Sequence, residues 1–405
     1  DPRPFSYTTP KLREERLPSF FSRTTEETHR LIRENIGLSP LYSGVIKGVS
    51  ARYCPSLEDK VMRFSEKGHH PVTLEFEGLD TEEVYAKGLG NCLPLELQER
   101  IVRSVLGLEQ AEIMRSAYAI EYDFVQPTQL KPTLETKPVR GLFLAGQING
   151  TSGYEEAAAQ GLWAGINAAL QVQGREPFTL GRSQAYMGVM VDDLITRGVD
   201  EPYRMFTSRA EYRLILREDN AVFRLMDKGH EFGLIPDQDY RGMMERTRQI
   251  DQGIGRLSSL TLKPTAEVNG ILSGMGSLPI RKPMTLFQLL KRPEMVYDSL
   301  RVFEGWSPIA DDDVKRQIEI EAKYEDYIRR QRESVEKFME LEHKKIPPDM
   351  DYGVVPGLSN ELKHKLQKIQ PSSIGQARRI SGMTQAALAA ILIFLKKMEL
   401  ERETG

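Results

Sequence analysis

Apolar and polar positions alternate in parts of the first half of the chain and follow a helical period in others. Val72–Phe76 alternates and predicts a half-buried strand, and Tyr118–Val125 is a second strand candidate. Glu26–Asn35 and Leu95–Leu106 have the spacing of helices, the first with a threonine N-cap at position 24 or 25. We therefore expect a mixed strand-and-helix region up to about residue 177.

Beyond residue 180 the helical period dominates. Asp311–Leu341 is rich in charge and predicts one long helix. Its apolar side is formed by Ile318, Ile320, Tyr324, Tyr327 and Ile328. The tail over residues 351–400 predicts short helices separated by Gly357, Pro371 and Gly382. Its N-cap signals are Ser359, Ser372 or Ser373, and Thr384.

The tail is rich in apolar residues for so small a unit. They include Leu362, Ile374, Ile380, Leu388, Ile391 and Leu395. Part of this apolar surface is needed for the tail's own core, and the remainder would suit a partner helix or domain. The border of that surface is basic and is formed by Lys396, Lys397, Arg378 and Arg379.

A glycine-rich segment between a predicted strand and a predicted helix is the most informative feature of the chain. Leu142–Ala145 predicts a buried strand, and Glu155–Ala169 predicts a helix of small residues. Gly146, Gly150 and Gly153 lie between them with an Asn and a Thr. Glycines let backbone approach a ligand closely, and a helix N-terminus suits a pyrophosphate or a flavin carbonyl. A crossover that binds nothing is the alternative, and the density of small and polar residues favours a ligand site.

Composition and charge narrow the class of protein. The 405 residues are 40% hydrophobic and 28% charged, which is ordinary for a soluble globular protein of two or three domains. The formal charge of −3 argues against binding of polyanions through bulk charge, but it is compatible with local patches. No apolar run reaches membrane-spanning length, and two cysteines without an export signal favour a reducing cytoplasm. Because no folding unit precedes Asp1-Pro-Arg-Pro, we expect a fragment of a longer chain.

Cys54 is the thiol with the more reactive surroundings. Arg52 and Lys60 are near it in sequence and would favour the thiolate, which is the form that a nucleophile needs. A small buried core residue is the alternative, and spacing alone favours it. Cys92 has no comparable cations and is predicted to be structural. The six histidines are scattered and no Cys/His pair has ligand spacing, so no metal site is expected.

Arginine and aromatic residues interleave over residues 201–217. Arg209, Arg213 and Arg217 are four residues apart, which would place them on one stripe of a helix. The aromatic residues among them are Tyr203, Phe206 and Tyr212. This combination suits phosphate contacts and base stacking. Salt bridges are the alternative, because acidic residues of the same segment nearly balance the arginines.

Four segments, in order along the chain, resemble the glucose-inhibited division protein A family. They are residues 52–60, 145–161, 202–213 and 374–382, and the resemblance extends over essentially the whole chain. The MnmG-type enzymes of this family build the 5-carboxymethylaminomethyl group on the wobble uridine of tRNA. The family's N-terminal Gly-x-Gly-x-x-Gly unit, which holds the adenine half of FAD, and a second cysteine from that region are not in this sequence.

The resemblance implies an α/β flavoprotein, with a Rossmann-like FAD-binding fold of the glutathione-reductase type, followed by an all-α C-terminal region. The implied domains are the end of an inserted α/β domain (1–50), the C-terminal part of the FAD-binding domain (51–180), a helical domain (181–350) and a small helical subdomain (351–405). Gln147 would face the isoalloxazine or ribityl end of FAD. The implied FAD contacts are Gly146, Gln147, Asn149, Gly150, Thr151, Gly153, Tyr154 and Glu155.

The resemblance also implies further site residues, cofactors and partners. Cys54 would be the catalytic thiol, and Arg52, Arg204, Arg209 and Arg213 would contact tRNA. NADH would reduce FAD, and methylenetetrahydrofolate would supply the one-carbon unit to C5 of uridine 34. The partners would be an MnmE-type GTPase, bound through the C-terminal helices, and a second copy of the chain in a homodimer. The segment associated with NAD is Ser50, Ala51, Arg52, Tyr53, Cys54, Pro55, Ser56, Leu57, Glu58, Asp59, Lys60, Val61, Met62, Arg63 and Phe64.

Two other functions fit part of the pattern. Folate- and FAD-dependent tRNA uracil-5-methyltransferases share the flavoprotein core but lack the long helical C-terminal region, so residues 311–405 count against them. The other is a non-catalytic module that binds tRNA and the GTPase. Flavin absorbance would distinguish an enzyme from such a module.

Overall fold

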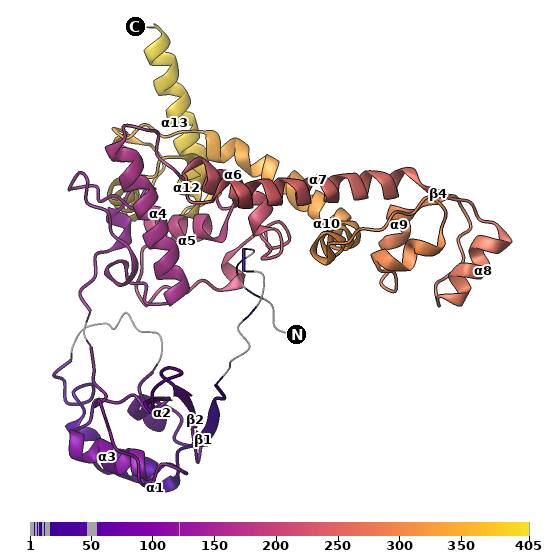
Figure 1. The fold of residues 1–405 in the computed structure, drawn as a ribbon. Helices are drawn as coiled ribbons and strands as arrows, with labels where there is room; N and C mark the ends of the chain where they lie inside the picture. Colours follow the sequence, from indigo (N-terminus) through magenta and orange to yellow (C-terminus); the bar gives the residue numbers. More distant parts are fainter. Residues whose placement is uncertain are drawn as a thin grey trace. The chain divides into compact units, whose positions relative to one another are not determined.

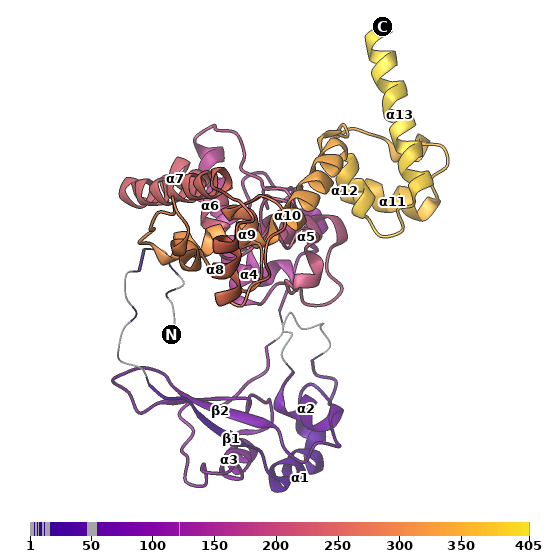
Figure 2. The same ribbon diagram turned by 90° about the vertical axis from the view of Figure 1, so that its right-hand side faces the viewer.

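The computed structural model describes residues 17–46, 55–120 and 122–404, together with positions 4, 6, 8, 9 and 12 (Figures 1 and 2). For residues 337, 338, 340–343 and 399–404 only the backbone is described. The contacts divide the chain into two units, each of which is described by itself. The first unit comprises residues 1–127, 144–161 and 199–204, and the second comprises residues 128–143, 162–198 and 205–405.

The first unit contains a three-stranded antiparallel sheet. Its strands, in spatial order, are β1 (Phe20–Arg23), β2 (Pro71–Phe76) and β3 (Val84–Lys87). Leu74 of the central strand lies opposite Phe20 on one side and Ala86 on the other. The strand predicted over Val72–Phe76 is confirmed, and Val72 is fully buried on the side that faces the core.

Three helices cover the core of this sheet unit. They are α1 (Glu26–Glu34), α2 (Leu57–Arg63) and α3 (Leu95–Arg103), and the first and third confirm predicted helices. Thr25 caps α1 in a capping box with Thr28, and both side chains also bond to Ser104 directly after α3. The cap therefore joins two helices. The buried core consists of Leu31, Ile32, Leu57, Val61, Val72, Leu89, Leu93, Leu97, Ile101 and Val105.

Two predicted strands are wrong. Residues 118–120 and 122–125 form no strand, and the Val125 N–H donates instead to the Ile148 carbonyl at 2.7 Å. In Leu142–Ala145 only Phe143 pairs, through an isolated bridge with Glu135, and Leu142 is 44% exposed. An apolar run becomes a strand only where a neighbouring strand accepts and donates its backbone hydrogen bonds. Among the described residues neither run has such a neighbour.

Helix α4 (Tyr154–Val172) follows the glycine segment and confirms the helix predicted over Glu155–Ala169. The later helices up to residue 343 are α5 (Tyr186–Arg197), α6 (Ala221–Glu231), α7 (Asp237–Ser259), α8 (Ala266–Gly274), α9 (Leu286–Leu290) and α10 (Asp312–His343). A short antiparallel pair, β4 (Thr261–Leu262) and β5 (Met284–Thr285), lies among them. Short 3-10 turns cover residues 36–38, 127–129, 146–149, 207–209, 297–302 and 352–354.

The long helix α10 confirms the prediction over Asp311–Leu341, and Asp311 is its N-cap. It packs against α7 and α9 (Figure 1). Ile318 and Ile328 are buried as predicted, whereas Tyr324 and Tyr327 are 45% and 58% exposed. Tyr324 follows the buried Ala322 by two residues, or about 200° around the helix, and therefore points away from the core. Placing the two tyrosines on the apolar side was wrong.

The C-terminal bundle, residues 344–404, consists of α11 (Asn360–Ile369), α12 (Ile374–Arg379) and α13 (Gln385–Thr404). Ser359, Ser373 and Thr384 each accept a backbone N–H of the following helix, which confirms the predicted caps. α13 is longer than expected and projects beyond the other two helices (Figures 1 and 2).

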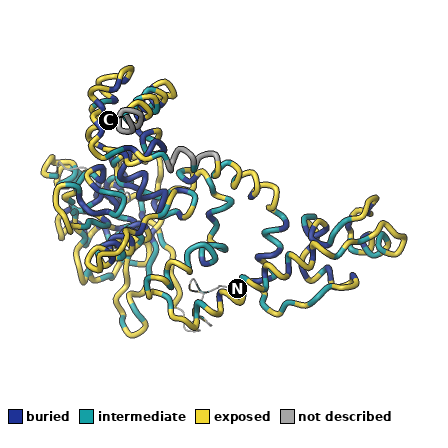
Figure 3. Tube along the Cα trace, turned by 90° about the horizontal axis from the view of Figure 1, so that it is seen from above, coloured by how far each residue is buried: buried dark blue, intermediate teal, exposed yellow. Residues whose placement is uncertain are grey.

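The bundle closes its own core. All six apolar residues that the sequence singled out are buried in it, and every buried member of the core lies between residues 346 and 395. Figure 3 shows buried and exposed positions interspersed along these helices and those before them. No helix in the described ranges is both long and apolar enough to span a bilayer.

Candidate functional site

The glycine segment forms a tight turn that is anchored on α4. Gly146 has φ +80°, and its N–H donates to Gln160 Oε1 at 2.8 Å. The Asn149 amide donates to the Leu144 carbonyl at 2.9 Å and to Gln160 Oε1 at 3.0 Å. A Cβ on Gly146 would lie 3.4 Å from the Cβ of Ala157. Gln160, one turn after Ala157, therefore holds both ends of this turn.

Gly150 is required by the packing of the protein itself. It has φ +68°, and a Cβ at this position would lie 2.7 Å from Cγ2 of Val199. Its carbonyl accepts the Tyr203 N–H at 2.9 Å. The sequence suggested that a ligand needs close approach here, but the close neighbour in the structure is the segment 199–204.

Gly153 lies against an ion pair that closes the turn. The Arg204 guanidinium is 3.3 Å from the Glu156 carboxylate in the first turn of α4. A Cβ on Gly153 would collide with that carboxylate and lie 3.1 Å from Arg204 Nη1. Arg204, which the resemblance assigned to tRNA, thus also anchors the glycine turn, while 40% of its side chain stays exposed.

The residues assigned to FAD divide into two groups. Gln147, Tyr154 and Glu155 are exposed, Tyr154 to 89%. Gly146, Asn149, Gly150, Thr151 and Gly153 are buried in the turn. Asn149 Oδ1 is buried and has no hydrogen-bond partner among the described residues. The first group is accessible from outside the turn, and the second group shapes its backbone.

The segment assigned to NAD is only partly described. Residues 50–54, including Cys54 and Arg52, lie outside the described residues. The rest begins with Pro55 and the N-cap Ser56 and continues as α2, in which Leu57, Glu58 and Val61 are buried. Met62, Arg63 and Phe64 are exposed. This segment therefore contributes both core residues and a surface.

A buried carboxylate and a thiol meet inside the first unit. Glu58 Oε1 accepts the Cys92 thiol at 2.8 Å and the Cys92 N–H at 3.0 Å, and Ser39 Oγ lies 3.3 Å away. Burial, together with the hydrogen bond to Glu58, raises the pKa of the Cys92 thiol. An unreactive thiol agrees with the structural role predicted for Cys92. Glu58 was not recognised as its partner because 34 residues separate them.

The arginines of residues 201–217 do not form a helical stripe. Its helical part is a 3-10 turn at Thr207–Arg209, and a further turn covers residues 213–215. Arg209 lies 3.6 Å from Asp193, and Arg217 pairs with Asp219 at 3.1 Å and Glu321 at 3.0 Å. Arg209 and Arg217 therefore form the salt bridges that the sequence offered as the alternative to phosphate contacts. Arg213 is exposed.

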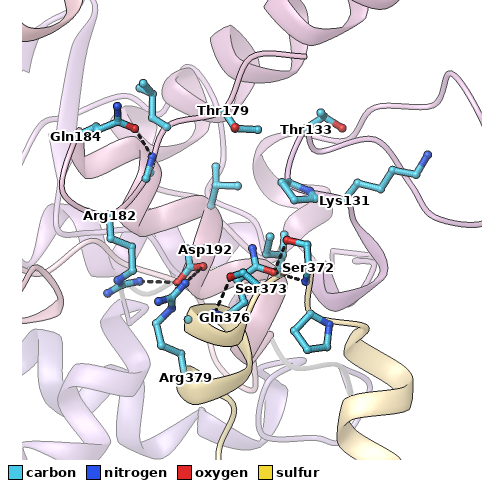
Figure 4. A pocket seen from close by; sticks show the side chains of 18 of the residues that line it. Lys131, Thr133, Thr179, Arg182, Gln184, Asp192, Ser372, Ser373, Gln376 and Arg379 are labelled. Carbon is cyan, nitrogen blue, oxygen red and sulfur yellow. Dashed lines mark hydrogen bonds and ion pairs between the residues drawn. The ribbon is translucent and has the colours of Figure 1, made fainter. Parts of the chain in front are cut away.

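A buried ion network joins α5 to the C-terminal bundle (Figure 4). Arg182 contacts Asp192 at 3.0 Å, Asp193 at 2.7 Å and Glu211 at 2.9 Å. Arg379 Nη2 donates to Asp192 Oδ1 at 2.7 Å. Burial opposes the charge of Arg182, but the surrounding carboxylates raise its pKa overall. The expectation that Arg379 borders a partner-facing surface was wrong, because its side chain pairs with Asp192 of α5.

This network forms part of the wall of a pocket of about 1650 Å³ within the second unit. One wall comes from residues 131–143, α4 and α5, and its cations are Lys131, Lys137, Arg175, Arg182 and Arg197. The other wall comes from α10 and the bundle, and its cations are Arg330, Lys345, Arg378 and Arg379. Among the described side chains, three acidic residues line the pocket: Glu135, Asp192 and Glu211. Sequence reasoning missed this pocket because its walls are far apart in the chain.

Lys137 joins the two walls. Its ammonium donates to the Thr128 carbonyl at 2.8 Å and to the Ile369 carbonyl at the end of α11 at 2.6 Å. Burial lowers the pKa of Lys137 to about 8. Its hydrogen-bond partners are backbone carbonyls, which carry no full charge. They therefore do not neutralise the charge of the buried ammonium.

Within the described ranges no three His, Cys, Asp or Glu side chains converge in a way that could hold a metal ion.

Comparison with known proteins defines the family. Residues 1–176 match the model of "Glucose inhibited division protein A". Residues 237–332 match the C-terminal helical domain of the tRNA modifying enzyme MnmG/GidA, and residues 334–405 match its C-terminal helical bundle.

Curated relatives and solved structures agree with these models. The tRNA uridine 5-carboxymethylaminomethyl modification enzyme MnmG of Syntrophobacter fumaroxidans is 55% identical over 98% of this chain and 62% of the relative. The MnmG of Geobacter sulfurreducens is 51% identical over 98% of the chain and 63% of the relative. The GidA of Aquifex aeolicus in crystal form I superposes with a TM-score of 0.80 at 46% identity, over 96% of this chain and 61% of that one.

The fold is therefore part of an α/β flavoprotein followed by an all-α region, as the sequence predicted. The chain belongs to the glucose inhibited division protein A family, also called MnmG or GidA. It spans about three fifths of the length of the curated relatives that it matches.

Proposed function

We propose that the chain is part of an FAD-dependent enzyme that modifies the wobble uridine of tRNA. With a partner GTPase it would add the carboxymethylaminomethyl or aminomethyl group to C5 of uridine 34, using methylenetetrahydrofolate and NADH. The observation that carries this proposal is the 55% identity, over 98% of the chain, to a relative named for this modification. Both C-terminal family models also match, which counts against the uracil-5-methyltransferase alternative.

The glycine turn fits a flavin contact. Gln147 and Tyr154 expose their side chains beside the N-terminus of α4, and Gly146 and Gly150 hold the backbone in the left-handed conformation that this presentation needs. We assign Gln147, Tyr154 and Glu155 as direct contacts and the buried turn residues as their support. Bound FAD would supply the redox chemistry, and the protein would position it and the uridine.

For the remaining site residues, the proposal follows the family segments. Cys54 would be the catalytic thiol, and the segment Ser50–Phe64 would contact NADH. Arg52, Arg204, Arg209 and Arg213 would contact tRNA. Arg213 is the exposed member of this group among the described residues, and Arg204 keeps part of its side chain accessible.

The partner proposals concern the bundle and a second copy of the chain. Ile393 of α13 is 72% exposed and lies beside the exposed Lys396 and Lys397. An exposed apolar residue bordered by cations suits a protein partner. We therefore propose that the GTPase binds α13 and that the homodimer forms through another surface. We propose the cytoplasm as the location of the complex.

Analysis of modified nucleosides tests the proposal. Cells in which the native codon for Cys54 is changed to serine should lose the wobble-uridine modification, as measured by mass spectrometry of digested tRNA. Loss of 5-methyluridine instead would support the methyltransferase. Normal nucleosides in cells lacking the whole protein would contradict both activities and favour the non-catalytic module.

A further inference from the structure

The pocket of the second unit carries an excess of positive charge that the chain as a whole does not have. Among the described side chains, nine Lys and Arg line it against three Asp and Glu, whereas the complete sequence has 55 basic and 58 acidic residues. The acidic side chains are already engaged: Asp192 and Glu211 bind Arg182, and Glu135 binds Lys131 at 2.6 Å. Six of the described lining cations remain in excess of these carboxylates, and two of them, Arg175 and Arg197, face Glu231 and Asp193 at 3.7 and 3.8 Å.

The donors around the pocket suit phosphate oxygens and ribose hydroxyls. Ser372 and Ser373 lie just before α12, where Ser372 Oγ donates to Gln376 Oε1 at 3.0 Å and Ser373 Oγ caps the helix. Thr133 and Thr179 come from the other wall (Figure 4). Hydroxyl and amide groups of this kind provide a large share of the backbone contacts of nucleic-acid-binding proteins. A surface that attracts anions through charge alone would not need hydroxyl and amide groups.

The size of the pocket also argues for an extended ligand. Pockets for small molecules enclose roughly 300–1,000 Å³. At about 1650 Å³ this pocket is larger, and residues of two walls line it. One turn before the lining residues Arg330 and Gln331, α10 exposes Tyr327 to 58% on the same helix face. An exposed aromatic ring beside cations suits stacking by an unpaired base.

We propose that this pocket, between the bundle and the 131–143/α5 wall, binds the phosphodiester backbone of the RNA substrate. Glu211 and Tyr212 also line it, so it adjoins the end of the segment 202–213 that the resemblance assigned to RNA. The buried Arg182–Asp192–Arg379 network forms the rigid floor, and the exposed Arg330 and Lys345 on the opposite wall contact phosphates. Tyr327 receives a base. This inference rests on the proposed tRNA substrate and extends its contact region from Glu211 and Tyr212 to α10 and the bundle.

Titration of the 405-residue chain with a labelled, unmodified tRNA transcript at 50–200 mM salt tests the proposal. Arg330→Ala/Lys345→Ala should bind more weakly, and the slope of log affinity against log salt should fall by about two, one for each lost phosphate contact. Both residues are exposed, so the fold should be retained. The matched control is Arg248→Ala/Lys263→Ala, which removes an exposed arginine and lysine outside the pocket and should leave both values unchanged.

Three results would overturn the proposal. The first is an unchanged slope for the pocket variant. The second is equally strong competition by polyglutamate, which would identify a site for an acidic peptide. The third is complete displacement of tRNA by millimolar pyrophosphate, which would identify a small-anion site. None of them contradicts the proposed function, because the nucleoside analysis of cellular tRNA measures that function independently.

Discussion

Arg379 of α12 donates to Asp192 of α5 across 187 residues of sequence, with Nη2 and Oδ1 2.7 Å apart. Both side chains are largely buried, and Asp192 also accepts from Arg182. The contact therefore attaches the C-terminal bundle through charge. If Arg379 is removed, Asp192 still pairs with Arg182 and is not left as an unpaired buried charge.

We predict that Arg379→Met lowers the free energy of unfolding by about 2 kcal/mol, the usual range for hydrogen bonds to charged groups. The matched control is Arg248→Met on α7, which removes an exposed pair with Glu245 and should cost about 0.5 kcal/mol or less. Urea denaturation measures both. Equal losses would show that the network does not stabilise the attachment.

Gly150→Ala should destabilise the glycine turn by about 1–3 kcal/mol, because the new Cβ meets Val199 and φ is +68°. Adding Val199→Ala removes the collision but leaves the backbone strain, so only part of the loss should return. Gly161→Ala on α4, where a Cβ meets open space, should stabilise by about 0.5–1 kcal/mol. Thermal unfolding distinguishes these outcomes. Full recovery in the double variant would mean that the conformation at Gly150 carries no strain.

The buried His29 and His70 should make the first unit sensitive to acid. Burial lowers the pKa of both, and their rings lie 5.1 Å apart. The positive charges of His69, Arg33, Lys60 and Lys67 also lower the pKa of one or both rings, while a backbone hydrogen bond to Lys60 raises that of His70. A lowered pKa in the folded state means that stability is complete above the unfolded value of about 6.5 and falls as the pH drops below it.

The expected slope is at most about 1.4 kcal/mol per pH unit for each histidine. Urea denaturation between pH 7.5 and 5 measures it, and His70→Gln should flatten the curve. A variant with an unchanged slope would mean that other groups cause the acid sensitivity.

In a Cys54→Ser background Cys92 is the only remaining thiol, since the sequence has two cysteines. Its raised pKa predicts slow reaction with a disulfide reagent at pH 8 compared with the unfolded protein. Glu58→Gln removes the negative charge that helps to raise this pKa and should speed the reaction. A slower reaction would show that access to the thiol, and not its ionisation, is limiting.

Local patterns were sufficient to predict α1, α3, α4, α10 and the three caps of the bundle, because helical period and capping are encoded within a few residues. Leu142–Ala145 shows the limit, since a strand depends on neighbours that the run itself does not specify. The pairs Glu58–Cys92 and Asp192–Arg379 were missed for a related reason. Each pair joins segments that are far apart in the chain, and no local sequence pattern indicates that the two segments meet. The basic pocket was missed for the same reason.

The C-terminal bundle has a kinetic consequence. Its buried apolar residues, from Ile346 to Leu395, form one core cluster within this stretch, although α12 also packs against α5 and α10. Folding is fast where contacts are close in sequence, because little loop-closure entropy is lost before they form. The stretch can thus complete its core without waiting for any other segment. Its apolar helices would be exposed only briefly during synthesis, which limits their opportunity to aggregate.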